Sequence, residues 1–166
     1  MVASLAALVV GYLFQPWRLW LDRTVHEPLP VTTDGAEGQS TGSDDRPVLR
    51  ELASGRFVSH EHPTTGSVRV LRLPDGSRTL RIDDLRTTDG PALEVWLAAA
   101  PVVPGRAGWF LFDDEEHVDL GALKGNIGDQ NYPIPAQVDL RGLRSVAVWC
   151  DRFDVSFGAA ALRFDN

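Results

Sequence analysis

The sequence predicts an all-β protein, an antiparallel β-sandwich of the jelly-roll or partly open barrel kind, that follows an N-terminal transmembrane helix. Three observations on the residues from 49 onward predict the β fold. Apolar and polar residues alternate with a period of two in several short runs. Residues that favour turns (Gly, Pro, Asn and Asp) separate these runs. No run there has the period of an amphipathic helix. Because no helices are expected between the short strands, neighbouring strands are expected to be antiparallel.

The first expected element is the transmembrane helix, at residues 1–21. The segment carries no charged side chain up to Phe14 and continues to Leu21, about the 20 residues that span a bilayer. Its amphipathic side chains suit the lipid–water interface: Tyr12, Trp17, Arg18 and Trp20. A cleaved signal peptide and a buried helix of a soluble fold are the alternatives. We prefer an uncleaved anchor because no A-x-A-like cleavage site follows the apolar run.

Residues 22–48 are expected to form a flexible extracytoplasmic stalk, because Gly, Pro, Ser, Thr and Asp dominate there and large apolar residues are rare. The β domain then occupies residues 49–166. We therefore expect a single-pass protein of the cell membrane, with its domain on the extracytoplasmic side.

Seven strands are expected within the domain. They lie at 55–61, 67–73, 78–83, 92–98, 108–112, 145–150 and 153–158. The second and third form the clearest hairpin, because Pro74-Asp75-Gly76-Ser77 between them is a turn sequence. In the fourth strand the alternation places Leu93, Val95 and Leu97 on one face of the sheet, with Glu94 and Trp96 on the other.

The segment at 120–135, "LGALKGNIGDQNYPIP", is too rich in Gly, Asn and Pro to predict a regular element. We expect a long ordered loop that packs on the sheet through Ile127, Tyr132 and Ile134, since burial of a large apolar side chain stabilises by roughly 1.5–3 kcal/mol.

Charge and cysteine content exclude several classes of protein. The net charge is −7, with one lysine, Lys124, and fifteen scattered arginines. This distribution lacks the basic stripe that phosphate backbones require, so nucleic acid is not an expected partner. The single cysteine, Cys150, excludes an internal disulfide and a metal site with several cysteines.

Four blocks in the domain, in order, resemble the DM13 domain, also called the electron-transfer DM13 domain. The resemblance covers about residues 55–162. His62 and Gly66 fit an H-x-x-S/T-G element, and "GPALEVWL" and the loop at 120–135 follow. "SVAVWCDRFDVSFGAAAL" then carries a W-C…F…F-G-x-A-x-L signature. Ala92 departs from the pattern, because many bacterial relatives have Asp there.

The resemblance implies an extracytoplasmic all-β domain whose single cysteine acts in electron transfer, as a free thiol or as a haem ligand. Cys150 is then the expected catalytic residue, and Cys150 and Trp149 are the expected cofactor-binding residues. A protein redox partner is implied as well. Such a chain is more like an electron-transfer or binding domain than an enzyme with its own turnover. The alternative is a non-catalytic cell-surface binding or adhesion module in which Cys150 is a core residue.

The residues around Cys150 leave its role open. Cys150 has the strand parity of Val146 and Val148, so it shares their face of the sheet. A free cysteine on a core face behaves as a small hydrophobic residue. A reactive thiolate needs a lowered pKa, whereas the neighbouring Asp151 raises it and Arg152 offsets Asp151.

No metal site is expected. His60 and His62 would share one face of a strand and could form a metal-binding pair, but no third ligand is evident beyond His117 in the acidic loop. Surface and loop-packing roles for the histidines are the preferred interpretation. Residues 113–116, "DDEE", lack the EF-hand spacing, and "KGNIG" lacks the Walker spacing.

Overall fold

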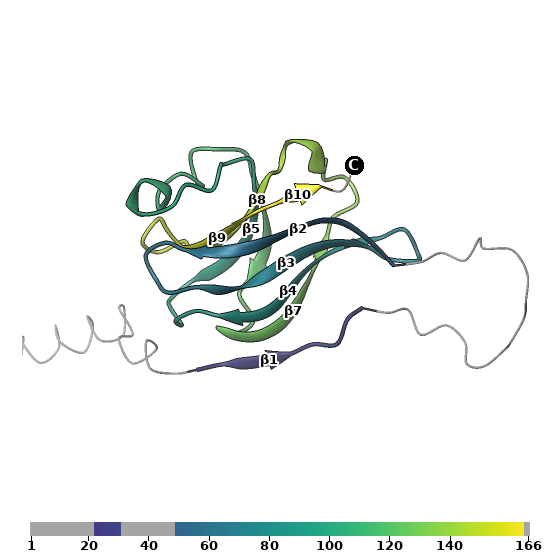
Figure 1. Cartoon of the computed structure of the whole chain (residues 1–166), viewed down its shortest axis with the longest axis horizontal. Helices are drawn as coiled ribbons and strands as arrows, with labels where there is room; N and C mark the ends of the chain where they lie inside the picture. The colour runs from purple at the N-terminus through teal and green to yellow at the C-terminus, as the bar shows by residue number, and fades with distance from the viewer. Residues whose placement is uncertain (1–21, 31–48, 165–166) are drawn as a thin grey trace, which may run out of the picture.

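The computed structural model describes residues 22–30 and 49–164, which form ten strands and two short 3₁₀ turns (Figure 1). The strands are β1 (Thr24–His26), β2 (Arg50–Ser59), β3 (Thr65–Arg72), β4 (Arg78–Arg86), β5 (Leu93–Ala98), β6 (His117–Ala122), β7 (Ile127–Ile134), β8 (Ser145–Cys150), β9 (Val155–Ala161) and β10 (Arg163–Phe164). The 3₁₀ turns are Arg106–Gly108 and Leu140–Gly142.

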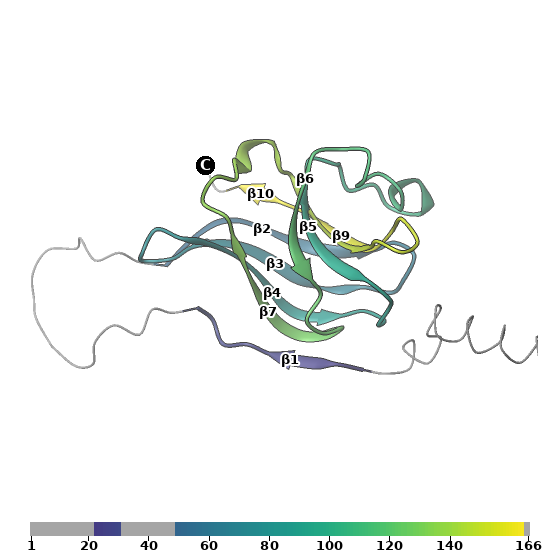
Figure 2. The ribbon, with the colours of Figure 1, turned by 180° about the vertical axis from the view of Figure 1, so that it is seen from behind.

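All ten strands belong to one curled sheet in the order β1-β7-β4-β3-β2-β9-β8-β5-β6, with β10 beside β2. Neighbouring strands are antiparallel, except that β1 runs parallel to β7. β2 joins the two halves, because its first part pairs with β3 and β10 and its last three residues pair with β9. Figures 1 and 2 show the result as an open half-barrel. The all-β prediction is confirmed. The expected β-sandwich is not, because the ten strands form one curled open sheet, which is closer to the partly open barrel that the prediction also named.

The concave side of the sheet holds the main core. Apolar side chains of β3 and β4, and Tyr132 and Ile134 of β7, face those of β5, β8 and β9 across it. Leu93, Val95 and Leu97 lie in this core, while Trp96 lies on the opposite face of β5, as the alternation predicts. The expected hairpin is also confirmed, since β3 and β4 pair across the turn at Pro74–Ser77.

A second, smaller core lies on the outer face of β5, β8 and β9. The segment between β5 and β6 covers it with Ala100 and Phe112, which pack against Trp96 and Trp149. This segment contains the region at 108–112 that was expected to be a strand. The strand prediction is wrong there, because Phe112 is fully buried in the outer core while Phe110 is exposed, and the backbone makes turns instead of pairing.

The segment expected as a loop at 120–135 is instead the end of β6 and the whole of β7. Tyr132, which is 2% exposed, and Ile134 pack in the core as expected, whereas Ile127 has the opposite strand parity and is only partly buried. The strand escaped prediction because Gly128 and Gln130 occupy two of its inward positions, where apolar residues would have marked the alternation. Tyr132 donates a hydrogen bond from its hydroxyl to Oε1 of Gln130 (2.8 Å), which satisfies both buried polar groups.

Residues 22–30 lie along β7, which differs from the flexible stalk that the sequence predicts for 22–48. Glu27 accepts hydrogen bonds from Nζ of Lys124 (2.7 Å) and from the backbone N–H of Asn131 (2.7 Å). Gly128 has φ 105°, and a Cβ there would overlap the carbonyl oxygen of Val25. The strand β1 therefore depends on close backbone approach to β7.

The expected transmembrane segment at 1–21 and the rest of the expected stalk, 31–48, lie outside the described residues. Within residues 22–30 and 49–164, no helix is long and apolar enough to cross a membrane.

Candidate functional site

Cys150 is the last residue of β8 and lies in the main core beside Val146 and Val148, on the face that its strand parity predicts. Its side chain has no solvent-exposed surface, and its thiol donates a hydrogen bond to the carbonyl oxygen of Pro91 (Sγ to O, 3.2 Å). Burial raises the pKa of the thiol; backbone N–H groups of the following turn, at Arg152 and Phe153, offset this in part. Cys150 is therefore a protonated thiol that makes a defined contact.

The surroundings of Cys150 do not fit a haem. A haem thiolate needs an ionised sulfur that faces a cavity, whereas this sulfur is protonated, enclosed by apolar side chains and bonded to Pro91. Trp149, the other expected cofactor-binding residue, lies in the outer core on the opposite face of β8. The structure therefore does not bring Cys150 and Trp149 together around one pocket.

Two of the blocks that carry the family resemblance meet at Phe157. The imidazole of His62 packs on the Phe157 ring, with 3.9 Å between ring centroids. Thr64 is buried, and its hydroxyl bonds the carbonyl oxygens of His62 (3.2 Å) and Phe157 (3.0 Å) and the hydroxyl of Thr87 (2.9 Å). Gly158 leaves room for Thr64, since a Cβ there would lie 2.5 Å from Cβ of Thr64. These signature residues therefore close one end of the core.

His60 and His62 do not form a metal-binding pair. β2 ends at Ser59, so the two histidines lie in a bend and not on one face of a strand. His60 is buried, with Nδ1 2.9 Å from Oγ of Ser156, while His62 packs on the other side against Phe157. Burial lowers the pKa of both imidazoles. Among residues 22–30 and 49–164, no three His, Cys, Asp or Glu side chains come together as a metal site.

Three aromatic rings form a stack on the outer face of the sheet, which sequence reasoning did not find. The rings of Trp149 and Trp96 are 4.9 Å apart between centroids, and those of Trp96 and His117 are 4.0 Å apart and almost parallel. Trp149 and Trp96 are buried, whereas His117 is exposed. The stack therefore runs from the residue next to Cys150 to the protein surface.

Strand register explains why these rings meet. Trp96 lies opposite Ala147 on β8 and opposite Asp119 on β6, so Trp149 and His117 are its diagonal neighbours on the same face. The neighbouring positions on this face are small, among them Ala98, which leaves space for the rings. Trp96 and His117 are 21 residues apart in the sequence, and His117 and Trp149 are 32 residues apart. The stack could therefore have been predicted only from knowledge of the pairing β8-β5-β6.

Glu94 gives the stack a titratable partner. The indole Nε1–H of Trp96 donates to Oε2 of Glu94 (3.2 Å). Burial raises the pKa of Glu94; the bond from Trp96 opposes this, and the negative charges of Asp119 and Asp151 add to it. Glu94 is thus a proton acceptor in direct contact with the central ring.

Comparison with known proteins agrees with the resemblance seen in the sequence. A family model described as Electron transfer DM13 matches residues 56–162. No curated protein and no solved structure matches the chain. The family match spans well over half of the 166 residues, including β3 to β9 in full. The chain therefore belongs to the electron-transfer DM13 family.

Proposed function

We propose that this chain is a membrane-anchored, extracytoplasmic electron-transfer domain in which Cys150 is the redox residue and Trp149, Trp96 and His117 lead single electrons to the surface. The stack of rings is the observation that carries the proposal. Thiol–disulfide exchange requires contact between two sulfur atoms, which full burial of Cys150 disfavours. Transfer of one electron needs no such contact, so burial and redox activity are compatible.

The proposed step begins at the thiol. Cys150 loses one electron and one proton and becomes a thiyl radical. A one-electron oxidant on a partner protein, such as an oxidised metal centre, takes the electron, and solvent water takes the proton when the turn that follows Cys150 opens locally. One peptide unit links Cys150 to Trp149, and ring contacts continue to Trp96 and His117. While Trp96 carries the oxidising equivalent, its Nε1 proton moves to the Glu94 carboxylate; the raised pKa of Glu94 favours this transfer.

Photochemical oxidation tests this route. A ruthenium(III) complex, generated by a laser flash, oxidises the purified full-length protein from its surface, and transient absorption follows tryptophan radicals. We expect Trp96→Phe to slow the arrival of the oxidising equivalent at Trp149 and Cys150. Trp109→Phe is the matched control, because Trp109 lies outside the stack. Equal kinetics in all three proteins would contradict the proposed route.

The anchor and the location are part of the proposal. Asp22 follows Leu21 directly, and the backbone N–H of Arg23 donates to Oδ1 of Asn126 (2.6 Å). If residues 1–21 cross the membrane, the β7 edge of the domain is held next to the bilayer. Protease treatment of intact cells should then release the domain, which lies outside the cytoplasm. Full protection of the domain would contradict this arrangement.

A second candidate function is a non-catalytic binding module at the cell surface, with Cys150 as a core residue. The absence of exposed sulfur surface and the raised thiol pKa favour it. Cys150→Ala separates the two candidates: a binding module keeps its photochemical behaviour and loses stability, whereas the electron-transfer domain loses the terminal radical. A native thiol that reacts with iodoacetamide as fast as free cysteine would contradict the burial on which both rest.

A further inference from the structure

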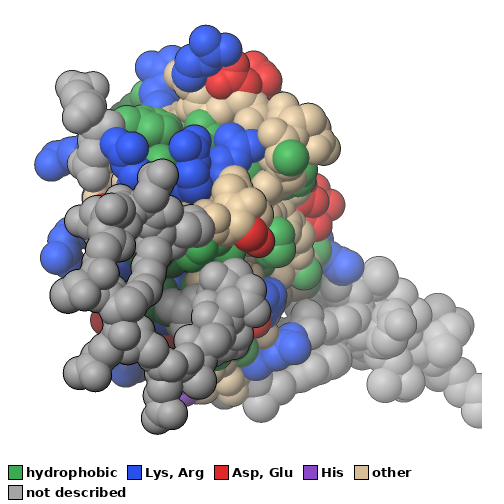
Figure 3. All heavy atoms as spheres, turned by 90° about the vertical axis from the view of Figure 1, so that its right-hand side faces the viewer, with side chains coloured by type: hydrophobic (Ala, Val, Ile, Leu, Met, Phe, Trp, Pro, Cys, Tyr) green, Lys and Arg blue, Asp and Glu red, His purple; other side chains and the backbone are tan. Residues whose placement is uncertain are grey.

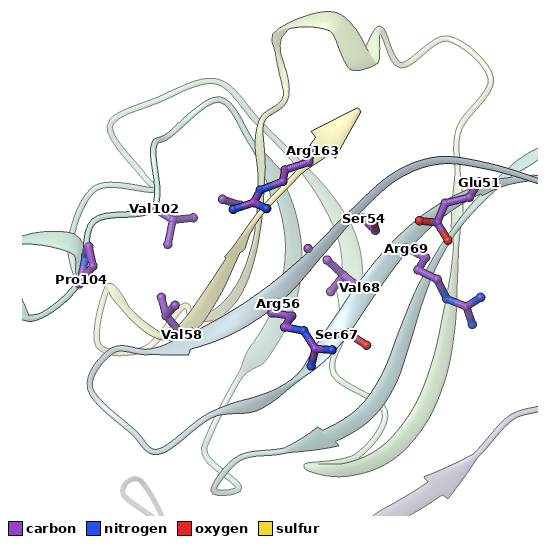
Figure 4. A pocket seen from close by; sticks show the side chains of 12 residues that line it. Glu51, Ser54, Arg56, Val58, Ser67, Val68, Arg69, Val102, Pro104 and Arg163 are labelled. Carbon is purple, nitrogen blue, oxygen red and sulfur yellow. The ribbon is translucent and has the colours of Figure 1, made fainter. Parts of the chain in front are cut away.

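A groove of about 630 Å³ lies on the outer face of β2 and β3, and its lining includes neither Cys150 nor a residue of the aromatic stack (Figure 4). Small residues form its floor, namely Ser54, Gly55, Ser67 and Ala161. Its volume falls within the range of small-molecule sites in proteins, roughly 300–1,000 Å³.

Strand register places arginines around this floor. Ser54 lies between Arg163 on β10 and Arg69 on β3, and Ser67 lies opposite Arg56 one row further along. Side chains opposite one another in antiparallel strands share a face, so three guanidinium groups and two hydroxyls surround the same hollow. Figure 4 shows the three arginine side chains extending from three different strands at the groove.

Two of these arginines have no acidic partner within residues 22–30 and 49–164. Arg69 donates from Nε to Oδ2 of Asp83 (2.8 Å). The negative charge of Glu51, at the same end of the groove, also raises the pKa of Arg69. Arg56 and Arg163 make no ion pair or side-chain hydrogen bond with any residue that the structure describes. In a chain with a net charge of −7, two guanidinium groups at one hollow thus have no acidic partner among the described residues. Figure 3 views the side of the molecule that lies on the right in Figure 1, where basic, acidic and hydrophobic side chains lie next to one another.

The opposite end of the groove is apolar. Val58, Val102 and Pro104 form this end, and Val58 is 37% exposed. Val102 and Pro104 come from the segment that covers the outer core, so the wall is attached to the sheet by packing. The groove therefore combines a cationic part with an apolar part.

We propose that this groove binds a small organic anion, with its carboxylate or phosphate between Arg56 and Arg163 and its apolar body against Val58, Val102 and Pro104. Guanidinium groups suit both anions because their planar N–H groups match oxyanion geometry. The hydroxyls of Ser54 and Ser67 add donors, and Glu51 repels an anion from the Arg69 end. The site is independent of the electron-transfer proposal.

Four probes test the proposal on the full-length protein by calorimetry and by amide chemical shifts: benzoate, phenyl phosphate, acetate and benzyl alcohol. Benzoate or phenyl phosphate should bind and shift the amides of Ser54, Arg56 and Arg163; which of them binds tighter identifies the preferred head group. Acetate lacks the apolar body and benzyl alcohol lacks the charge, so each should bind at least about tenfold more weakly.

Arg56→Gln and Arg163→Gln should each weaken binding of the better probe about tenfold, which corresponds to one charge-assisted hydrogen-bonded contact. Arg72→Gln is the matched control, because Arg72 is an exposed arginine of β3 outside the groove. Amide spectra without probe establish that each variant is folded. Equal binding of benzyl alcohol and benzoate, equal loss in Arg72→Gln, or no binding of either aromatic anion would overturn the proposal.

Discussion

The Tyr132 side chain allows a quantitative test of how β7 is attached to the core. It is 2% exposed, its hydroxyl donates to Oε1 of Gln130 (2.8 Å), and it accepts a hydrogen bond from the backbone N–H of Lys124 (3.1 Å). Two substitutions separate these contributions. Tyr132→Phe removes the hydroxyl alone, whereas Tyr132→Ala removes the ring from the main core as well.

The two substitutions differ in expected magnitude. In Tyr132→Phe, Oε1 of Gln130 keeps the N–H donors of Lys124 (3.0 Å) and Gly125 (3.2 Å), so no buried group is orphaned. The loss should be that of an ordinary hydrogen bond, about 0.5–1.5 kcal/mol. In Tyr132→Ala, loss of a buried aromatic ring should lower the free energy of unfolding by about 3–5 kcal/mol.

Alkaline pH gives a second, independent measure. Burial raises the pKa of Tyr132 from 10.0 to about 12. Between these values the unfolded chain releases a proton that the folded protein retains, so the free energy of unfolding falls as pH rises. The expected slope is about 1.4 kcal/mol per pH unit within this window. The contribution is fully present below pH 10.0 and absent from Tyr132→Phe.

Urea unfolding of the three proteins at neutral pH and at several alkaline pH values measures both effects. Tyr12→Phe is the control for the other tyrosine, which lies outside the described residues. A loss below about 0.5 kcal/mol in Tyr132→Ala would show that the ring is not part of the core, since surface substitutions have effects of that size. Parallel pH profiles for wild type and Tyr132→Phe would refute the burial of the hydroxyl.

Three further predictions concern backbone strain, close packing and acid stability. Ala92 has φ 54°, a left-handed backbone conformation that glycine adopts without strain. Ala92→Gly should therefore raise the free energy of unfolding by about 0.5–1 kcal/mol, and a lower free energy of unfolding in thermal unfolding would contradict the strain. Gly158→Ala should destabilise by about 1–3 kcal/mol because its Cβ meets Thr64; unchanged stability in urea would show that Thr64 can move away. Burial lowers the pKa of His60 and His62, so stability should fall as pH drops through their ordinary value of 6.5, and His62→Gln should flatten that dependence in acid titrations.

The sequence by itself determined the all-β class and the faces of the regular strands. Period-two alternation places Val146, Val148 and Cys150 on one face of β8, and the structure has all three in the main core. This inference works because side-chain direction in a strand depends only on local parity. The same local reasoning failed at β7, where Gly128 and Gln130 hide the alternation.

Only the tertiary structure decided which strands are neighbours, and the sites follow from that. The stack of Trp149, Trp96 and His117 depends on the order β8-β5-β6, and the arginines of the groove come from β2, β3 and β10. Residues 22–30 look like a linker in the sequence because their contacts are with distant residues. Glu27, for example, pairs with Lys124, which lies 97 residues further along the chain. The physical reason is that pairing and register are set by burial and hydrogen bonding between distant segments, and no local pattern records them.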